Sequence, residues 1–238
     1  MMLLYLKNRF HHLMGFSLEK PVWYDATMND LDISVIDIIP RASDEIHKRL
    51  ELAVIEVFSE VDFDQANMRE IARKAGMSFS TIYKYYKNKN HLLFGFVQFW
   101  FTVLQDRIRD HLQGIEDTRE KLRKLIWVQL DYFERNEAIG RIIWIRTPIS
   151  AWMADKAYED NPLLEIILEI LREGQARGTI DSDIRTALCV NLLVSTTSWA
   201  FIDWVYKGKG RRLTEELEPV FAVVWRAVGN PETTQGII

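Results

Sequence analysis

Apolar side chains recur every three or four residues through most of this chain, and this period is the feature that most restricts its fold. It begins after Ser43 and continues to the region of residue 228. Residues at this spacing share one face of a helix, so each run predicts an amphipathic helix. No run alternates between apolar and polar residues as a half-buried strand does. We therefore expect an all-α protein with about nine helices.

Polar residues that can cap helices mark where the first four helices begin. Ser43, Ser78 and Asn88 each stand directly before an apolar run. Asn67 is followed three residues later by Glu70, as in a capping box. The side-chain oxygen at such a position accepts a hydrogen bond from a backbone N–H that the first turn leaves free. We expect four helices before residue 112, of which the second and third are short.

The remainder of the chain also has helical spacing. Asn161 and Pro162 supply a cap and a first-turn proline, while Gly178 and Gly208 stand where helices should stop. Pro219 obscures where the last helix begins. The later helices are expected near residues 118–133, 162–178, 184–206 and 217–228.

Residues 1–40 carry no sustained helical period and end at Pro40. They hold three basic and five acidic residues, which argues against a basic arm in the minor groove of DNA. Lys7 and Arg9 interrupt the N-terminal apolar residues, so no signal-peptide core forms, and no other stretch approaches the roughly 18 to 20 apolar residues that span a membrane. Cys189 is the single cysteine and stands among apolar residues, as a small buried side chain would. We expect a cytoplasmic protein with no membrane partner.

Residues 67–86 have the pattern of a helix, a tight turn and a second helix. Ala72 is small where two helices must approach, Gly76 permits the turn, and Ile82 supplies a buried anchor. If Ile82 and Tyr85 point inward, the outer face of the second helix consists of Phe79, Ser80, Thr81, Tyr83 and Lys84. In a helix-turn-helix, the N-terminal half of this helix enters the major groove.

Basic residues are concentrated in the same segment. Between Ala66 and His91 there are six lysines and arginines against one acidic residue, Glu70, although the whole chain has a net charge of -4. Such a concentration on one element is typical of phosphate binding. The alternative for a generic pattern of this kind is a solvated face, or a surface that docks an acidic protein.

The run from Ile71 to Leu93, IARKAGMSFSTIYKYYKNKNHLL, resembles the signature of the TetR family of transcriptional regulators. The resemblance implies a dimer that binds a palindromic operator as a repressor and is released by a small, hydrophobic effector. An activator, or a helical protein-interaction module with a basic face, is the alternative. We divide the chain into an N-terminal extension (1–40), a helix-turn-helix DNA-binding domain (41–90), an effector-binding and dimerisation domain (91–230) and a tail (231–238).

The resemblance also implies roles for single residues. Those expected at DNA are Asn67, Arg69, Ser78, Phe79, Ser80, Thr81, Tyr83, Lys84, Tyr85 and Lys89. Ser78 would cap the recognition helix, the next three residues would lie nearest the base edges, and the hydroxyl and ammonium groups that follow would contact phosphates. Many members have Lys-Gly after the capping serine, where this chain has Phe79 and Ser80. A phenyl ring can touch a thymine methyl or simply pack, so the operator sequence cannot be inferred.

Seven of the eight tryptophans follow the DNA-binding segment, on helices that should face one another. An aromatic-rich helical body can enclose a small apolar or amphipathic ligand. We expect an effector pocket bounded by Trp100, Trp127, Phe133, Trp152 and Trp199. For each ring, ordinary packing in the core is the alternative.

The last two helices are the dimer interface that the resemblance implies. The penultimate helix carries small side chains that would let another helix approach closely, and the last has a wide apolar stripe. The residues expected at the interface are Ser195, Ser198, Leu217, Phe221, Val224 and Val228. The alternative is that both stripes belong to the core of a single chain.

Sequence features of an enzyme are missing. The five histidines show no metal-ligand spacing, and neither a phosphate-binding glycine loop nor a nucleophile elbow occurs. We expect no catalytic residues, no metal and no cofactor. The expected partners are double-stranded operator DNA, a small-molecule effector and a second copy of the chain.

Overall fold

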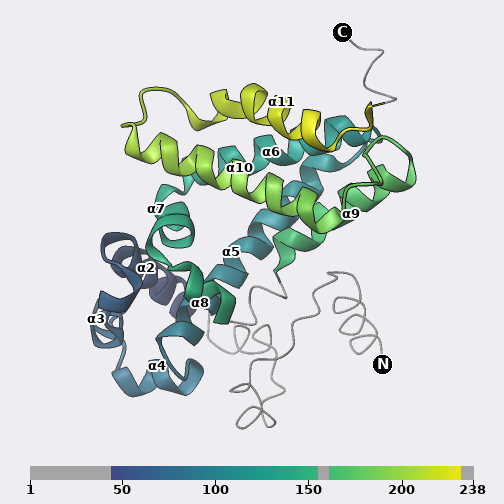
Figure 1. The fold of residues 1–238 in the computed structure, drawn as a ribbon. Coiled ribbons are helices and arrows are strands. Elements are labelled where there is room, and N and C mark those ends of the chain that lie inside the picture. The colour runs from purple at the N-terminus through teal and green to yellow at the C-terminus, as the bar shows by residue number, and fades with distance from the viewer. Residues whose placement is uncertain (1–43, 155–160, 232–238) are drawn as a thin grey trace, which may run out of the picture.

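The computed structural model describes residues 44–154 and 161–231 of the chain (Figure 1). Within these residues it has ten α-helices, and the β-type pairing there is an isolated bridge between Ile180 and Gly229. The prediction of an all-α fold is confirmed. The predicted cap Ser43 and the extension over residues 1–40 lie outside the described residues.

Three helices form a small group at the N-terminal end of the described chain (Figure 1). They are α2 (Asp44–Glu60), α3 (Met68–Lys74) and α4 (Phe79–Tyr85), with the 3-10 helix η3 (Phe63–Gln65) between α2 and α3. Val54, Ile71 and Ile82 are fully buried where the three helices meet. One long helix and two short ones were predicted here, and the structure has them.

The helix α5 (Lys89–Leu112) runs from this group into the body of the molecule (Figure 1). Its predicted cap is confirmed, because the side chain of Asn88 accepts a hydrogen bond from the backbone N–H of His91 at 2.8 Å. Every residue from Leu92 to Val97 is buried; Phe96 packs against His47 of α2, and Phe94 packs against Trp152 of α8. Further on, α5 packs along α6 (Thr118–Arg135).

Three short elements that the apolar spacing does not predict follow α6. They are α7 (Glu137–Arg141), a π-helical segment (Ile142–Arg146) and α8 (Ile149–Ala154). The backbone N–H and the hydroxyl of Thr147 both donate to the carbonyl oxygen of Ile142, at 3.1 and 2.7 Å, which closes the wider turn. Both α7 and the π-helical segment pack against α2, so they join the body to the small helical group.

The body is completed by α9 (Pro162–Ala176), α10 (Thr186–Tyr206), the 3-10 helix η6 (Leu213–Glu216) and α11 (Leu217–Val228). Asn161 caps α9 as predicted, since its side chain accepts from the N–H of Leu163 at 2.9 Å. Gly178 and Gly208 follow α9 and α10 with φ of 71° and 82°, where glycine is favoured. Pro219 lies in the first turn of α11, where a missing N–H breaks no helical hydrogen bond.

The helix α10 contradicts one expectation from the sequence. Over Thr186–Tyr206 it is long and apolar enough to cross a membrane, by length and composition alone. It packs against α6, α9 and α11, as a helix of a bundle does. Its buried side includes Cys189, and burial raises the pKa of that thiol.

Candidate functional site

The turn between α3 and α4 is fixed by a residue of α2. Gly76 has a φ of 61°, which an L side chain rarely adopts, and a Cβ there would lie 2.8 Å from Nη2 of Arg49. Arg49 donates hydrogen bonds to the carbonyl oxygens of Ala75, at 2.6 and 3.0 Å, and of Gly76, at 2.8 Å. Sequence reasoning missed Arg49, because a basic residue on an exposed helix face normally implies only solvation.

Hydroxyl groups organise the start of α4. Ser78 caps the helix as predicted, with its Oγ accepting from the N–H of Thr81 at 3.1 Å. The same oxygen lies 2.8 Å from Oγ of Ser80 and 2.7 Å from Oγ1 of Thr81. These predicted DNA-contacting residues therefore form one small cluster at the N-terminal end of α4. In the same way, Asn67 caps α3 by accepting from the N–H of Arg69 at 2.9 Å.

Two aromatic rings stand on the outer face of α4. Phe79 is 40% exposed and Tyr83 43% exposed, and their ring centroids are 4.5 Å apart. The guanidinium of Arg69 lies 5.6 Å above the Phe79 ring, within range of a cation–π contact. The predicted residues Arg69, Phe79 and Tyr83 are thus brought together. Tyr85 is half-buried against the core instead.

The charge of this surface is positive. Arg69, Arg73, Lys84 and Lys87 are exposed there. The remaining base of α3, Lys74, forms an ion pair with Glu56 of α2. The exposed bases can contact phosphates without first giving up a partner in the core.

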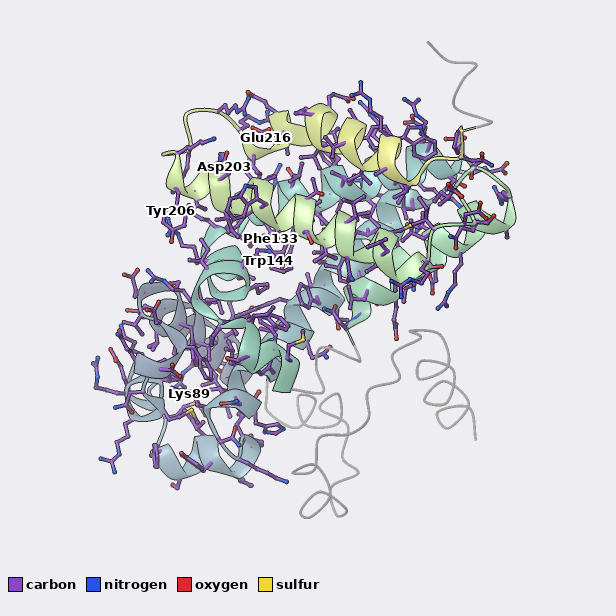
Figure 2. The ribbon with its side chains drawn as sticks, viewed as in Figure 1. Lys89, Phe133, Trp144, Asp203, Tyr206 and Glu216 are labelled. Carbon is purple, nitrogen blue, oxygen red and sulfur yellow. The ribbon has the colours of Figure 1, made fainter. Side chains whose placement is uncertain are left out.

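Lys89 is placed differently from the prediction (Figure 2). Its ammonium donates to the carbonyl oxygens of Phe63 and Asp64, at 2.6 and 3.1 Å, and lies 4.5 Å from the centroid of the Phe63 ring. Two of its three N–H donors are thus engaged within the chain. Lys89 fastens the start of α5 to η3, and the expected phosphate contact does not follow from this geometry.

The five residues predicted to bound an effector pocket do not form one group. Trp100 is buried beside α2, where its Nε1 donates to Oε1 of Glu51 at 2.8 Å. Trp127 is half-buried beside His111. Trp199 is 67% exposed on α10, so it lines no interior space of this chain. Sequence spacing places a ring on a helix but does not say which of two apolar faces turns inward.

Phe133 and Trp152 belong to a continuous series of rings through the body. Neighbouring centroids in this series are 5.1 to 6.4 Å apart. The series, in order of contact, is Phe94, Trp152, Phe101, Trp144, Phe133, Phe201 and Trp204. Figure 2 shows Phe133 and Trp144 next to each other in the body. Trp144 was missed because it lies in the π-helical segment, where the helical period fails.

A surface pocket of about 250 Å³ lies at the C-terminal end of α10. Its lining includes Asp203, Trp204 and Glu216, and Figure 2 labels both carboxylates. Lys207 and Lys209 also line it, but Lys207 pairs with Asp203 at 2.9 Å, and Lys209 with Glu137 of α7 at 2.6 Å. No cluster that could hold a metal ion occurs among the residues described.

The predicted dimer residues fall into two groups. Phe221, Val224 and Val228 are at most 3% exposed and face the core of the single chain, which corrects the prediction for them. Leu217 packs partly on the same core, and Ser198 is half-buried. Ser195 is exposed on α10.

The exposed face of α10 carries a stripe of large apolar side chains. Leu188, Trp199 and Tyr206 are 53%, 67% and 71% exposed, and they follow helical spacing together with Ser195. On the neighbouring helix α11, Val223 is 54% exposed. Scattered apolar residues on a surface are ordinary, but an aligned stripe on adjacent helices is typical of an interaction surface.

The small helical group and the helical body together define a DNA-binding regulator of the helix-turn-helix class. Two family models match the chain. Residues 53–95 match the model described as bacterial regulatory proteins of the tetR family, and residues 100–227 match the C-terminal region of YsiA-like proteins. The chain belongs to the TetR family.

Several similar proteins are named as regulators. The regulator UidR of Escherichia coli (strain K12) is 25% identical over 163 residues, which are 65% of this chain and 79% of UidR. The transcriptional activator FasR of Mycolicibacterium smegmatis is 30% identical over 106 residues, 44% of this chain and 48% of FasR. The fatty acid metabolism regulator protein of Bacillus subtilis is 26% identical over 156 residues, 64% and 80% of the two chains.

The fold is shared with solved structures, among them two regulators named FadR. The fatty acid degradation regulator FadR of Bacillus halodurans has a TM-score of 0.67 and 22% identity, covering 77% of this chain and 96% of its own. FadR of Bacillus subtilis, solved in complex with stearoyl-CoA, has a TM-score of 0.67 and 20% identity, covering 75% and 97%. At this identity the likeness establishes the fold.

Proposed function

We propose that this chain is a cytoplasmic, dimeric repressor that binds a palindromic operator and releases it when a fatty acyl effector enters the body. The outer face of α4 is the observation that carries the proposal. Phe79 and Tyr83 remain exposed there, although aromatic side chains usually find burial. Ser80, Thr81 and Lys84 add hydroxyl and ammonium groups, which contact base edges and phosphates in DNA complexes.

The proposed effector is supported by the ring series. Its members come from α5, α6, the π-helical segment, α8 and α10, so a ligand that separates the rings would displace several helices together. A fatty acyl chain suits an interior of rings and aliphatic side chains. Bacillus subtilis FadR was solved with stearoyl-CoA, and a further relative is named for fatty acid metabolism.

We assign the signal from body to DNA to α5 and the π-helical segment. The helix α5 begins directly after α4 and carries Phe101 of the ring series. Two bonds tie these elements to the small helical group: Trp100 Nε1 donates to Oε1 of Glu51 on α2 at 2.8 Å, and Arg146 Nη1 donates to Oδ1 of Asp62, directly before η3, at 2.9 Å. An effector that binds one arrangement of these elements better than the other shifts the equilibrium between them.

We place the dimer interface on the exposed stripe of α10 and on the adjoining face of α11. The stripe replaces the buried α11 residues that the sequence indicated. A second copy of the chain would bury Trp199 and Tyr206, which are each about two thirds exposed in one copy. A dimer also supplies the two recognition helices that a palindromic site requires.

An activator is the second candidate. FasR, which is 30% identical to part of this chain, is named a transcriptional activator. The same α4 face would serve either role, because the position of the operator relative to the promoter decides the outcome. Transcription from the bound promoter in the presence of the purified protein separates the two, since a repressor lowers it and an activator raises it.

The DNA-binding proposal is tested by fluorescence anisotropy with DNA flanking the gene, at two salt concentrations. Wild type is compared with Thr81→Ala and Lys84→Ala, and with Arg172→Ala as a control for an exposed base on α9. Wild type should bind tightly and with strong salt dependence, and both α4 variants should bind more weakly. Binding that is equal in all four proteins, or no better than to random DNA, would favour the protein-interaction module.

A further inference from the structure

Nε2 of Gln129 and Nε1 of Trp144 are N–H groups buried in the body that have no hydrogen-bond partner in the part of the chain that the structure describes. Nε of Arg146 is a third such group, but that guanidinium is paired with Asp62 through Nη1. Gln129 is 2% exposed, in the middle of α6. Buried donors in folded proteins almost always find an acceptor, and a donor without one destabilises the fold. Donors of this kind therefore indicate a missing acceptor.

The other tryptophans of the interior show that Trp144 is unusual. Nε1 of Trp100 donates to Glu51 at 2.8 Å, and that of Trp152 donates to the carbonyl oxygen of Ile143 at 3.3 Å. Each of these indoles combines an apolar body with a satisfied donor, as buried tryptophans normally do. Trp144 has the apolar contacts without the satisfied donor.

Gln129 remains a free donor in either orientation of its amide. Oγ1 of Thr197 lies 3.5 Å from Oε1 of Gln129, and this hydroxyl also donates to the carbonyl oxygen of Leu193 at 2.9 Å. If the amide were turned over, its nitrogen would meet Thr197 instead. An amide nitrogen carries two N–H groups, so at least one of them would still lack an acceptor.

Both donors flank the same ring of the series. Gln129 lies one helical turn before Phe133 on the same face of α6. Trp144 meets Phe133 edge to face, with centroids 5.9 Å apart and the planes at 72°. Both donors therefore lie near Phe133, which Figure 2 labels beside Trp144.

We propose that Gln129 and Trp144 bind the oxygen acceptor of the effector, a carboxylate or a thioester carbonyl, while its hydrocarbon part lies among the rings. This rests on the proposed function, in which the body binds a fatty acyl effector. A few placed polar groups in an apolar site fix the orientation of a ligand. Two donors without an acceptor favour an oxygen ligand and disfavour an ammonium group.

The test measures binding of fatty acids, their coenzyme A thioesters and alkylamines of matched chain lengths, from octyl to stearyl, by isothermal titration calorimetry. The variants are Gln129→Met, which nearly keeps the shape of the side chain, and Trp144→Phe, which keeps an aromatic ring of smaller size; both remove the N–H donor. Gln113→Met, on the surface, and Trp127→Phe, at a half-buried tryptophan outside the ring series, are the matched controls. Operator affinity without ligand and the melting temperature are measured for every protein.

The expected result is that acids or thioesters bind, that amines of equal length bind much more weakly, and that each N–H deletion weakens acceptor binding about tenfold. The same deletions should leave operator affinity unchanged. Gln129→Met should keep or raise the melting temperature, because it removes an unsatisfied donor, whereas Trp144→Phe should lower it, because the smaller ring leaves unfilled space beside Phe101 and Phe133. Comparing the affinity for the acid with that for the thioester shows whether the bound acceptor is a carboxylate or a thioester carbonyl. The proposal would be overturned if amines bound as tightly as acids, or if the variants lost stability but bound acids and thioesters normally. A wild-type protein that does not bind an operator would overturn only the proposed function.

Discussion

At the residue scale, the geometry of the α4 face depends on Arg49. This side chain donates to the carbonyl oxygens of Ala75 and Gly76, and it occupies the space that a side chain at Gly76 would need. The turn sets the angle between α3 and α4, and with it the direction of Phe79 and Thr81. A residue that touches no DNA can therefore determine how DNA is contacted.

Replacement of Arg49 by Met should lower the free energy of unfolding by about 1 kcal/mol and weaken operator binding, because two turn carbonyls lose their donors. Chemical denaturation and anisotropy measure the two effects. Lys48→Met, at the next exposed position of α2, removes the same charge and should change neither quantity. If both variants behave alike, the effect belongs to charge and not to the turn.

Phe79 should contact the methyl groups of thymines, since it is exposed beside Tyr83 and has no polar group to offer a base. Replacing thymidine by deoxyuridine in the operator should weaken wild-type binding about fourfold for each methyl group contacted, which corresponds to about 0.8 kcal/mol. Phe79→Ala should be insensitive to this replacement. An operator affinity that is unaffected by the missing methyl groups in wild type contradicts the assignment.

At the element scale, the sequence predicts where most helices begin because capping is local chemistry. Asn67, Ser78, Asn88 and Asn161 all accept a first-turn N–H, as their positions indicated. The elements between α6 and α9 were not predicted, since the π-helical turn at Ile142 changes the spacing of apolar residues. Part of the candidate site, including Trp144, lies in this stretch.

An ion pair between α6 and α9 makes the stability of the fold depend on pH. Glu173 of α9 accepts from Lys121 of α6 at 2.7 Å, and this bond lowers the pKa of Glu173 against the opposing effect of its partial burial, with a further contribution from Arg177. A carboxyl whose folded pKa is lowered adds stability above its unfolded pKa and loses it as the pH falls through the folded pKa. Glu173→Gln should therefore unfold more easily at neutral pH, by about 0.5 kcal/mol, and should match wild type in acid.

Thermal unfolding across this pH range measures the Glu173 effect. In a Lys121→Met background, the change from Glu173 to Gln should have a much smaller effect at neutral pH, because its main partner is already gone. If Glu173→Gln is as destabilising in the Lys121→Met protein as in wild type, the stabilisation comes from some other contact of Glu173.

At the scale of the whole molecule, two predicted surfaces changed places. Phe221 and Val224 were expected between subunits and lie in the core, whereas Trp199 was expected inside and lies on the surface. α10 is apolar on more than one face, so periodicity alone could not decide which of its faces meets the body. α11 has one main apolar stripe, and periodicity located it without showing whether it meets the body or a second subunit. Only the packing of α10 against α6, α9 and α11 resolves it.

Trp199→Glu should convert the dimer to a monomer without unfolding the subunit, because the ring is already 67% exposed in one chain. Sedimentation velocity measures the mass, and circular dichroism checks the fold. Ile149→Glu, a similar change at a residue of α8 that is 73% exposed, is the control and should leave the mass unchanged. If the Trp199→Glu protein stays dimeric, the α10 stripe is not part of the dimer interface.

The measurement that bears most directly on the account is a footprint of the protein on an operator selected from random DNA. We predict two symmetric protected half-sites about one helical turn or slightly more apart, with protection lost in Phe79→Ala and Thr81→Ala and in the presence of the bound acyl ligand. Failure to enrich any sequence, or a single protected site without symmetry that persists in both α4 variants, would contradict the account of this chain as an operator-binding dimer.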